Sequence, residues 1–264
     1  LPFLWGRRTK LLPPHPQPAA ASPALAQKTV NSVPYRHLFF DLDHTLWDFA
    51  RNSREALLEI YQEWRLTEYL GVSAERFLVI YQEENDQLWS QYRAGRMDKA
   101  TLRVERFARS LNRLGASDGS LARQFDEAYL ARAPLKTSLI PGTISLLNHL
   151  QGRYRLHILT NGFEETQHHK LKQTGLASYF EEVITSDQVK AHKPAARLFV
   201  TALRRAGATR RESLMIGDSW EADVLGARGA GIAQAYFNPA ETPISGRFRP
   251  TYEIRKLVEL TQHL

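Results

Sequence analysis

The chain of 264 residues contains no cysteine, and none of its apolar runs is long enough to span a bilayer. The first absence excludes disulfide bonds and is compatible with a reducing compartment, so we expect a cytoplasmic protein. The second predicts that no membrane is among its partners. No Gly-x-Gly-x-x-Gly follows the first predicted strand, which argues against a dinucleotide-binding domain. These absences leave a globular protein without disulfides as the expectation.

Acidic residues are absent from the first 34 residues, and this explains much of the basic character of the chain. The formal net charge is +7 and the sequence pI is about 9.7, values that could suggest nucleic-acid binding. However, Arg7, Arg8, Lys10 and Lys28 carry more than half of that charge, and the remainder is spread among many acids. A nucleic-acid interface needs clustered charge, so we predict no nucleic-acid partner.

Residues 1–34 also hold seven of the 13 prolines and show no apolar periodicity, so we expect a disordered or extended tail. Arg7-Arg8 before a partly apolar stretch, with Ala24–Ala26 as a cleavage site, is weakly similar to an export signal. The prolines interrupt the apolar region that such a signal needs. A further hypothesis is that the residues before Val33 are upstream sequence, and mass spectrometry of the native N-terminus would test it.

The most informative segment runs from His37 to Trp47, where a short apolar strand ends in Asp41 and Asp43, followed by Thr45. Side chains at i and i+2 of a strand point to the same side, so the two carboxylates are expected to lie together. Like charges placed in this way raise one pKa unless a cation or a shared proton relieves them. A hard divalent cation with oxygen ligands is the expected relief.

Three later segments supply partners for these acids. Ile158–Gly162 is an apolar strand that ends in Thr160 and a turn containing Asn161. Lys193 precedes a proline, and Leu214–Asp223 is a strand that ends in Asp218 with Asp223 five residues later. Polar groups that follow buried strands mark the edge at which open parallel α/β sheets bind ligands.

In their order along the chain, Asp-x-Asp-x-Thr, Thr, Lys and Gly-Asp-x-x-x-x-Asp resemble the four motifs of the haloacid dehalogenase-like hydrolase superfamily. The resemblance covers residues 36–237. It implies that Asp41 attacks phosphorus to form an aspartyl phosphate, and that Asp43 protonates the leaving group and then activates water. Superfamily members that cleave carbon–halogen bonds lack an acid at the position of Asp43, so its presence favours phosphoryl chemistry.

The resemblance also assigns the remaining groups. It implies that the Thr160 hydroxyl and the next backbone N–H, that of Asn161, bind phosphate oxygens. Lys193 would offset charge on Asp41 and on the phosphoryl group. Mg²⁺ is the expected cofactor, with Asp218 as a direct ligand. The side chain of Asp41 and the backbone carbonyl of Asp43 complete the set of expected protein ligands.

Asp223 is expected to act on the metal through water or to hold Lys193 in place.

Apolar spacing of three and four residues predicts helices near 52–66, 73–93, 98–114 and 118–132, with Ser53, Ser73 and Asp98 as N-caps. From Pro141 onward, predicted strands and helices alternate, which indicates βαβ units and a parallel sheet that also includes the first strand near 36–41. The predicted strands lie near 154–160, 182–185, 213–217 and 232–236, and the predicted helices near 142–151, 163–174, 195–207 and 220–230. We therefore expect an α/β fold, a doubly wound parallel sheet of the Rossmann-like type with an inserted helical cap. The expected division is a core of residues 35–50 and 136–264 and a cap of residues 51–135.

His44 stands where most superfamily members have glycine, and Asp-Leu-Asp-His-Thr-Leu-Trp-Asp-Phe resembles a bacterial branch of pyrimidine nucleotidases. That resemblance implies a small phosphomonoester substrate, in particular a nucleoside 5′-monophosphate. His44 could replace glycine conformationally or face the substrate, and an aromatic of the cap, Trp47 or Phe49 could stack on a base.

Two other functions stay open from the sequence. A sugar-phosphate phosphatase or a phosphomutase would use the same core, and a phosphoacceptor signalling module would share an acid cluster, a threonine and a lysine. The sequence gives no indication of the oligomeric state.

Overall fold

The computed structural model describes residues 35–116 and 118–264, so the expected tail at 1–34 lies outside the described residues. A six-stranded sheet, in which all pairs are parallel, has the strand order β3-β2-β1-β4-β5-β6. The strands are β1 His37–Phe40, β2 Arg155–Thr160, β3 Glu182–Thr185, β4 Ser213–Gly217, β5 Ala233–Phe237 and β6 Tyr252–Ile254. Five of the six lie where the alternating pattern predicts them, and β6 was not predicted because it is only three residues long.

Strand β1 lies in the middle of the sheet because it is apolar on both faces. Leu38 and Phe40 belong to one buried cluster and Phe39 to the cluster on the opposite face. The register pairs Phe40 with Ile158 of β2 and Ile216 of β4. The three strands therefore end at the same level, and the polar residues that follow them share one edge of the sheet.

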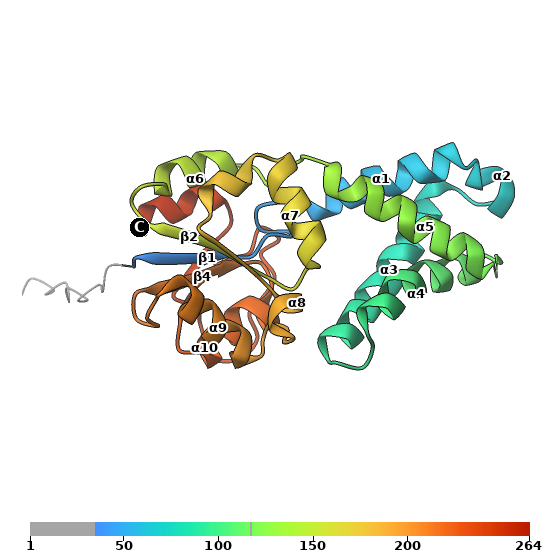
Figure 1. The fold of residues 1–264 in the computed structure, drawn as a ribbon. Helices are drawn as coiled ribbons and strands as arrows, with labels where there is room; N and C mark the ends of the chain where they lie inside the picture. The colour runs from blue at the N-terminus through green and yellow to red at the C-terminus, as the bar shows by residue number, and fades with distance from the viewer. Residues whose placement is uncertain (1–34, 117) are drawn as a thin grey trace, which may run out of the picture. The chain divides into compact units, whose positions relative to one another are not determined.

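Helices cover both faces of this sheet, as Figure 1 shows. One face is covered by α6 and α7, and the other by α9 and α10. The bounds are α6 Thr143–Leu150, α7 Glu164–Gln173, α8 Ser186–Val189, α9 Ala196–Ala206 and α10 Gly226–Gly229, with a π-helical turn η3 at Trp220–Leu225. The 3₁₀ segments are η1 Ala133–Leu135, η2 Leu176–Tyr179 and η4 Leu257–Gln262. The fold is thus the doubly wound α/β type that the sequence predicts.

The insertion between β1 and β2 is helical and has its own core. Its helices are α1 Phe49–Glu63, α2 Leu66–Leu70, α3 Ala74–Arg93, α4 Lys99–Arg113 and α5 Gly119–Arg132. Aromatic rings fill its centre, with Phe77, Phe107 and Phe125 fully buried within one cluster. Most cap aromatics therefore serve packing, as expected from their spacing.

The N-caps of α3 and α4 are Ser73 and Asp98, as predicted. The prediction for Ser53 is wrong, because α1 begins earlier and is capped by Asp48, whose side chain accepts a hydrogen bond from the Arg51 backbone N–H. Ser53 lies inside the helix and accepts a hydrogen bond from Tyr129 at 2.9 Å.

The two linkers to this insertion run side by side and are hydrogen-bonded to each other. The backbone N–H of Ile140 donates to Leu46 at 2.9 Å, and that of Asp48 donates to Ser138 at 3.1 Å. The Asn52 side chain donates to the Ser138 carbonyl at 2.8 Å and accepts from its N–H at 3.1 Å. These hydrogen bonds lie where the chain passes between the two parts, in keeping with the proposed division into a core of residues 35–50 and 136–264 and a cap of residues 51–135.

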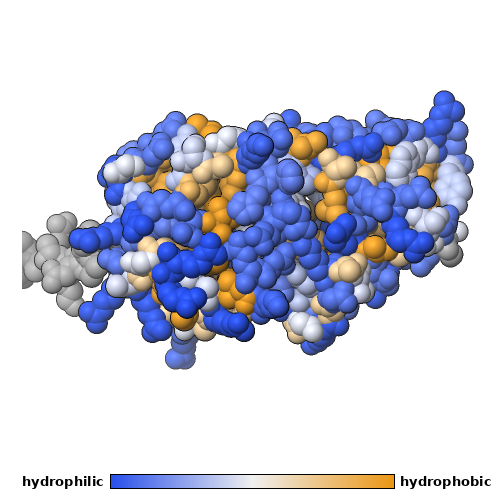
Figure 2. Space-filling view, viewed as in Figure 1, coloured by the Kyte–Doolittle hydropathy of each residue, from blue (hydrophilic) through white to orange (hydrophobic). Residues whose placement is uncertain are grey.

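None of the helices in the described part of the chain is both long and apolar enough to cross a membrane. The face drawn in Figure 2 is mostly hydrophilic, with apolar residues in small separate groups. Scattered apolar groups of this kind are normal on the surface of a folded protein.

Candidate active site

A cavity of about 240 Å³ lies between the carboxyl ends of β1, β2 and β4 and the cap helix α3. All seven residues predicted for the site line it: Asp41, Asp43, Thr160, Asn161, Lys193, Asp218 and Asp223. The sheet register explains this convergence, because these residues follow neighbouring strands or lie in the adjoining loops and turn.

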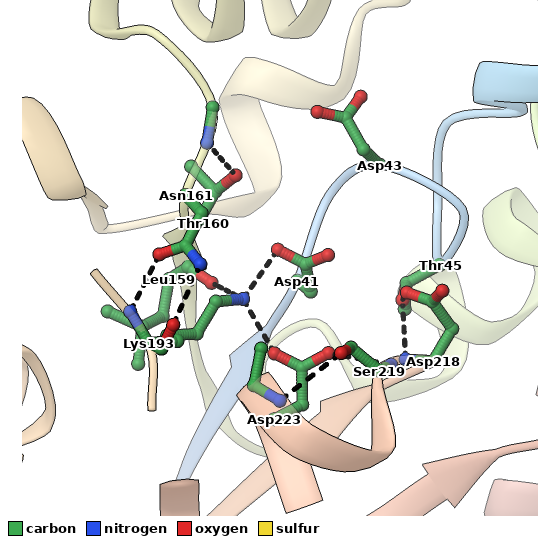
Figure 3. Close-up of polar contacts among 12 residues, drawn as sticks. Asp41, Asp43, Thr45, Leu159, Thr160, Asn161, Lys193, Asp218, Ser219 and Asp223 are labelled. Atoms are coloured by element: carbon green, nitrogen blue, oxygen red, sulfur yellow. Dashed lines mark hydrogen bonds and ion pairs between the residues drawn. The ribbon is translucent and has the colours of Figure 1, made fainter. Parts of the chain in front are cut away.

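Lys193 is the centre of an ionic cluster and is 2% exposed (Figure 3). Its Nζ donates to Asp41 Oδ1 and to the Leu159 carbonyl, both at 2.7 Å. Asp223 Oδ1 lies 2.6 Å from the same nitrogen as an ion pair. A single cation therefore holds two carboxylates that would otherwise repel each other.

Burial raises the pKa of Asp41 to about 6, although the Lys193 cation opposes this shift. Burial also raises the pKa of Asp218 to about 6, and the Asp41 charge adds to the effect. Burial also raises the pKa of Asp223. The pKa of Lys193 is raised above its ordinary value because its two carboxylate partners together outweigh burial. Three acids against one cation leave the site with an excess of negative charge.

The residues present fit a divalent metal ion. Oxygen atoms of Asp41, Asp218 and Asp223 lie within 4.8 Å of one another, and these are the hard donors that Mg²⁺ prefers. Burial raises the pKa of Asp41 and of Asp218, and a bound cation would oppose that shift. The carboxylate of Asp43 is not part of this group, so its predicted contact with the metal rests on its backbone carbonyl and stays a prediction.

Glycine at position 217 is required by this arrangement. A Cβ there would lie 2.3 Å from Asp223 Oδ2, which is closer than a Cβ approaches a non-bonded atom in real proteins. The same oxygen accepts a hydrogen bond from the Ser219 N–H at 3.0 Å, so Asp223 cannot move away freely. Asp218 is fixed in turn by Thr45, whose hydroxyl donates to Asp218 Oδ1 at 3.0 Å and accepts from its N–H at 3.1 Å.

Asn161 ties two loops of the site together through a reciprocal pair of bonds. Its side chain donates to the Lys193 carbonyl at 3.1 Å and accepts from the Lys193 N–H at 2.7 Å. The Thr160 hydroxyl oxygen accepts from the Gly162 N–H at 3.1 Å and from Gln167 at 2.7 Å. With its oxygen held in this way, the Thr160 hydroxyl can still donate its proton to an anion.

Asp43 is oriented by two residues of α7 that the sequence reasoning missed. Its Oδ1 accepts from Lys170 at 2.6 Å and its Oδ2 from Gln167 at 2.9 Å. In Figure 3 its carboxylate points away from Asp41. Lys170 is buried and lies 4.2 Å from the centre of the Trp47 ring. Only their spacing of three on a predicted helix could have suggested that Gln167 and Lys170 face the site together.

His44 adopts the left-handed backbone conformation, with φ of 62°. That conformation favours glycine, so His44 does stand in for glycine conformationally. Its ring also packs against Phe49 at 4.8 Å between centroids, and both residues line the cavity. The two roles considered for His44 are therefore compatible.

The cap contributes one stripe of α3 to the cavity; a cap aromatic near the substrate was considered from the sequence, but which one, and the two polar residues beside it, were not predicted. Asn85, Trp89 and Arg93 follow at i, i+4 and i+8, so they face the same side of the helix. The Trp89 ring stacks on Phe163 of the core at 5.3 Å with 26° between the planes. Nothing in a single sequence separates these residues from the packing aromatics on the same helix.

A polar contact joins the cap to the core beside the cavity. Lys99 at the start of α4 lies 2.8 Å from Glu165 and 2.9 Å from Asp187, and its Nζ lies 4.6 Å from the centre of the Phe163 ring. Tyr92 donates to Asp187 at 3.3 Å. We refer to Lys99, Glu165, Asp187 and Tyr92 as the latch.

Comparison with known proteins identifies the family. The family model for haloacid dehalogenase-like hydrolases matches residues 35–231. The chain belongs to this family. The resemblance predicted from the four motifs is thereby confirmed.

Relatives extend over most of the chain. It is 35% identical to the pyrimidine 5′-nucleotidase YjjG of Escherichia coli, over 86% of this chain and 96% of that protein. It is 33% identical to the pyrimidine 5′-nucleotidase PynA of Streptococcus pneumoniae, over 86% and 93% respectively. The crystal structure of the HAD-hydrolase YfnB of Bacillus subtilis bound to magnesium is similar, with a TM-score of 0.78 and 30% identity over 87% of this chain and 98% of that one.

Proposed function

We propose that this hydrolase is a Mg²⁺-dependent phosphatase that acts through an aspartyl phosphate on nucleoside 5′-monophosphates, with pyrimidine nucleotides as the best substrates. The observation that carries the proposal is the arrangement of Asp41, which has one carboxylate oxygen bound to a buried lysine and lies in a cavity with two further acids, the buried Asp223 and the half-buried Asp218. Such an arrangement positions a nucleophile and neutralises charge, which are the main requirements of phosphoryl transfer.

In the first step an oxygen of Asp41 attacks phosphorus while the bond from phosphorus to the ester oxygen breaks. Lys193 holds Oδ1, so Oδ2 is the oxygen left to attack. Lys193 and the Thr160 hydroxyl then stabilise negative charge on the phosphoryl oxygens. Asp43 in its protonated form donates a proton to the leaving oxygen, and for this step the contacts of its carboxyl with Lys170 and Gln167, which suit the ionised form, must be released.

In the second step water attacks the phosphorus of the aspartyl phosphate and the bond to Asp41 breaks. Asp43, now ionised, accepts the proton of that water, and inorganic phosphate leaves. Bound Mg²⁺ would neutralise charge on the phosphoryl group, held by the side chains of Asp41 and Asp218 and the backbone carbonyl of Asp43. Asp223 would hold Lys193 between itself and the nucleophile.

The substrate class is supported by the relatives and by the cap. Two relatives that match over most of their length are named pyrimidine 5′-nucleotidases. Trp89 of the cap lines the cavity, and base stacking on an aromatic ring contributes about 1–3 kcal/mol. The proposed partner is therefore a small-molecule nucleotide.

A sugar phosphate is the second candidate substrate. A stretch of 99 residues is 40% identical to a glyceraldehyde 3-phosphate phosphatase of Methanothermobacter thermautotrophicus, which covers 44% of that protein. Because this match covers only a part of each chain, we rank it below the nucleotide.

A phosphate-release screen with Mg²⁺ tests the proposal. We expect kcat/KM for UMP and dTMP to exceed that for triose and hexose phosphates by at least about tenfold, equivalent to about 1.4 kcal/mol of transition-state binding. The reverse preference would replace the nucleotide by a sugar phosphate. Absence of released phosphate with every ester would refute the phosphatase itself, and transfer of phosphate to a second position of the same sugar would indicate a mutase.

A further inference from the structure

Asn85 of the cap has a buried hydrogen-bond acceptor with no partner. The residue is 3% exposed, and its Oδ1 makes no hydrogen bond to any described residue. It lines the same cavity as Asp41 and Lys193. A buried acceptor without a partner destabilises a folded protein, so its presence beside a catalytic cavity points to a ligand that supplies the missing donor.

A second buried asparagine of the cap shows what a structural role looks like. Asn52 is fully buried, and both ends of its amide are bonded to Ser138. Its place between the two linkers accounts for its presence. Asn85 has no comparable role, although it is buried to almost the same degree.

The surroundings of Asn85 suit a flat ring with polar edges. Trp89 follows one turn later on α3 and is fixed by its stacking on Phe163. An aromatic face beside an amide is the combination by which proteins hold an unpaired base: the face takes the ring and the amide takes its edge. The acid cluster lies on the opposite side of the same cavity, where the phosphate end of the molecule would be held.

We propose that Asn85 recognises the base of the nucleotide: its amide, whose Oδ1 is buried and unpaired, turns toward the cavity when the base enters, and Oδ1 then accepts a hydrogen bond from the N3–H of a uracil or thymine ring beside Trp89. The inference rests on the proposed function, and it assigns the preference of the enzyme for one kind of base to Asn85. The Asn85 Nδ2 would donate to the carbonyl oxygen adjacent to N3, so that one planar amide reads two neighbouring groups of the base.

The test compares three substrates: UMP, its N3-methyl derivative and ribose 5-phosphate. N3-methylation removes the donor, and ribose 5-phosphate has no base. In the wild type we expect kcat/KM for UMP to exceed both by at least about tenfold, since a site built for a hydrogen bond rejects analogues that lack it. In Asn85→Leu, UMP and N3-methyl-UMP should become equal within about twofold, while ribose 5-phosphate keeps its wild-type value within the same margin.

Asn52→Leu is the matched control for stability and selectivity. It removes two satisfied hydrogen bonds and should lower the melting temperature, with kcat/KM changing by the same factor for all three substrates. Asn85→Leu should leave the melting temperature unchanged or raise it, because leucine replaces a buried group whose acceptor is unpaired. A lower melting temperature with equal loss on all substrates would make Asn85 a structural residue and overturn the inference.

Direct binding separates this inference from the proposed function. Calorimetry with Asp41→Asn and Mg²⁺ measures affinity for UMP without turnover, and the double variant with Asn85→Leu should bind UMP at least about tenfold more weakly. If the wild type hydrolysed no ester yet UMP binding depended on Asn85, the phosphatase would be refuted and base recognition retained. If UMP were hydrolysed and bound equally well with leucine at this position, base recognition by Asn85 would be wrong and the phosphatase would stand.

Discussion

The two sides of the cavity differ in how their polar groups are satisfied. On the core side, Lys193, Asp41 and Asp223 are bonded to one another, and Thr45 holds Asp218. On the cap side, the acceptor of Asn85 has no partner among the described residues. The acid cluster of the core is thus held together before any ligand arrives, as suits the phosphate group common to all phosphomonoesters. The cap is complete only with a ligand, as suits the part of the substrate that varies.

The strongest way to break this comparison is to remove the nucleophile. Asp41→Asn keeps the size of the side chain, so the fold should survive, but an amide cannot attack phosphorus. We expect phosphate release from UMP to fall by at least about 10⁴-fold, because enzymes accelerate such hydrolyses by many more orders of magnitude. Residual activity within tenfold of the wild type, measured in a preparation free of contaminating phosphatase, would exclude Asp41 as the nucleophile.

Metal removal tests whether the acid cluster of the core can support catalysis without a bound cation. With three acids against one cation, we expect excess chelator to stop phosphate release and added Mg²⁺ to restore it. The measurement is phosphate release before and after titration with Mg²⁺, with Ca²⁺ as the comparison ion because its larger size suits this chemistry poorly. Full activity in excess chelator would exclude the metal site at Asp41 and Asp218.

Lys193→Met would leave Asp41 and Asp223 buried without their cation. Breaking a buried ion pair from one side costs about 3–5 kcal/mol of unfolding free energy, and denaturant unfolding measures it. The loss should be smaller at pH 5 than at pH 8, because protonation of either carboxylate removes the repulsion. Equal losses at both pH values would show that the lysine acts through packing.

The raised pKa of Asp41 gives the sign of a pH effect on metal affinity. Its folded pKa of about 6 lies above the ordinary value of 3.8, so in the metal-free protein this group contributes stability that is fully present below pH 3.8 and lost as the pH rises through 6. Mg²⁺ must displace that proton, and Asp218 has a similarly raised pKa, so its affinity should be at least about tenfold weaker at pH 5 than at pH 7.5. Calorimetric titration at the two values checks this, and a pH-independent affinity would contradict it.

The smallest expected effect concerns the latch. Lys99→Met removes two partly exposed ion pairs between cap and core, each contributing up to about 1 kcal/mol. We expect KM for UMP to rise about two- to fivefold and to lose part of its dependence on salt, with kcat little changed. Arg51→Met is the control, because the pair of Arg51 with Glu55 lies within one cap helix. An equal response in both variants would exclude a role of the latch in substrate binding.

The core side could be predicted from the sequence because its residues follow apolar strands. Asp41, Thr160 and Asp218 each come directly after a buried run or end it, and parallel strands bring such positions to one edge. Most of the strand bounds were predicted for the same reason, whereas the order of the strands in the sheet was not. Strand β6 was missed, because a strand of three residues is too short to show an alternation of apolar and polar side chains.

The cap side could not be predicted, and the reason is physical. Asn85 and Trp89 lie on a helix whose other face is the aromatic core of the cap, so binding residues and packing residues share the same spacing. Gln167 and Lys170 were missed because their target, Asp43, is distant in sequence. Such contacts depend on tertiary packing and leave no local pattern.

The paired linkers at Leu46–Asp48 and Ser138–Ile140 have a consequence for the order of folding. Strand β1 must pair with β2 and β4, which lie beyond the entire cap in the sequence. The cap helices contact mainly their own sequence neighbours, so they can assemble early and locally, whereas the sheet needs long-range closure. During synthesis the cap emerges before β2, and its assembly would bring the two linkers together. A folded cap would thus shorten the loop that the first strand must close before the sheet can form.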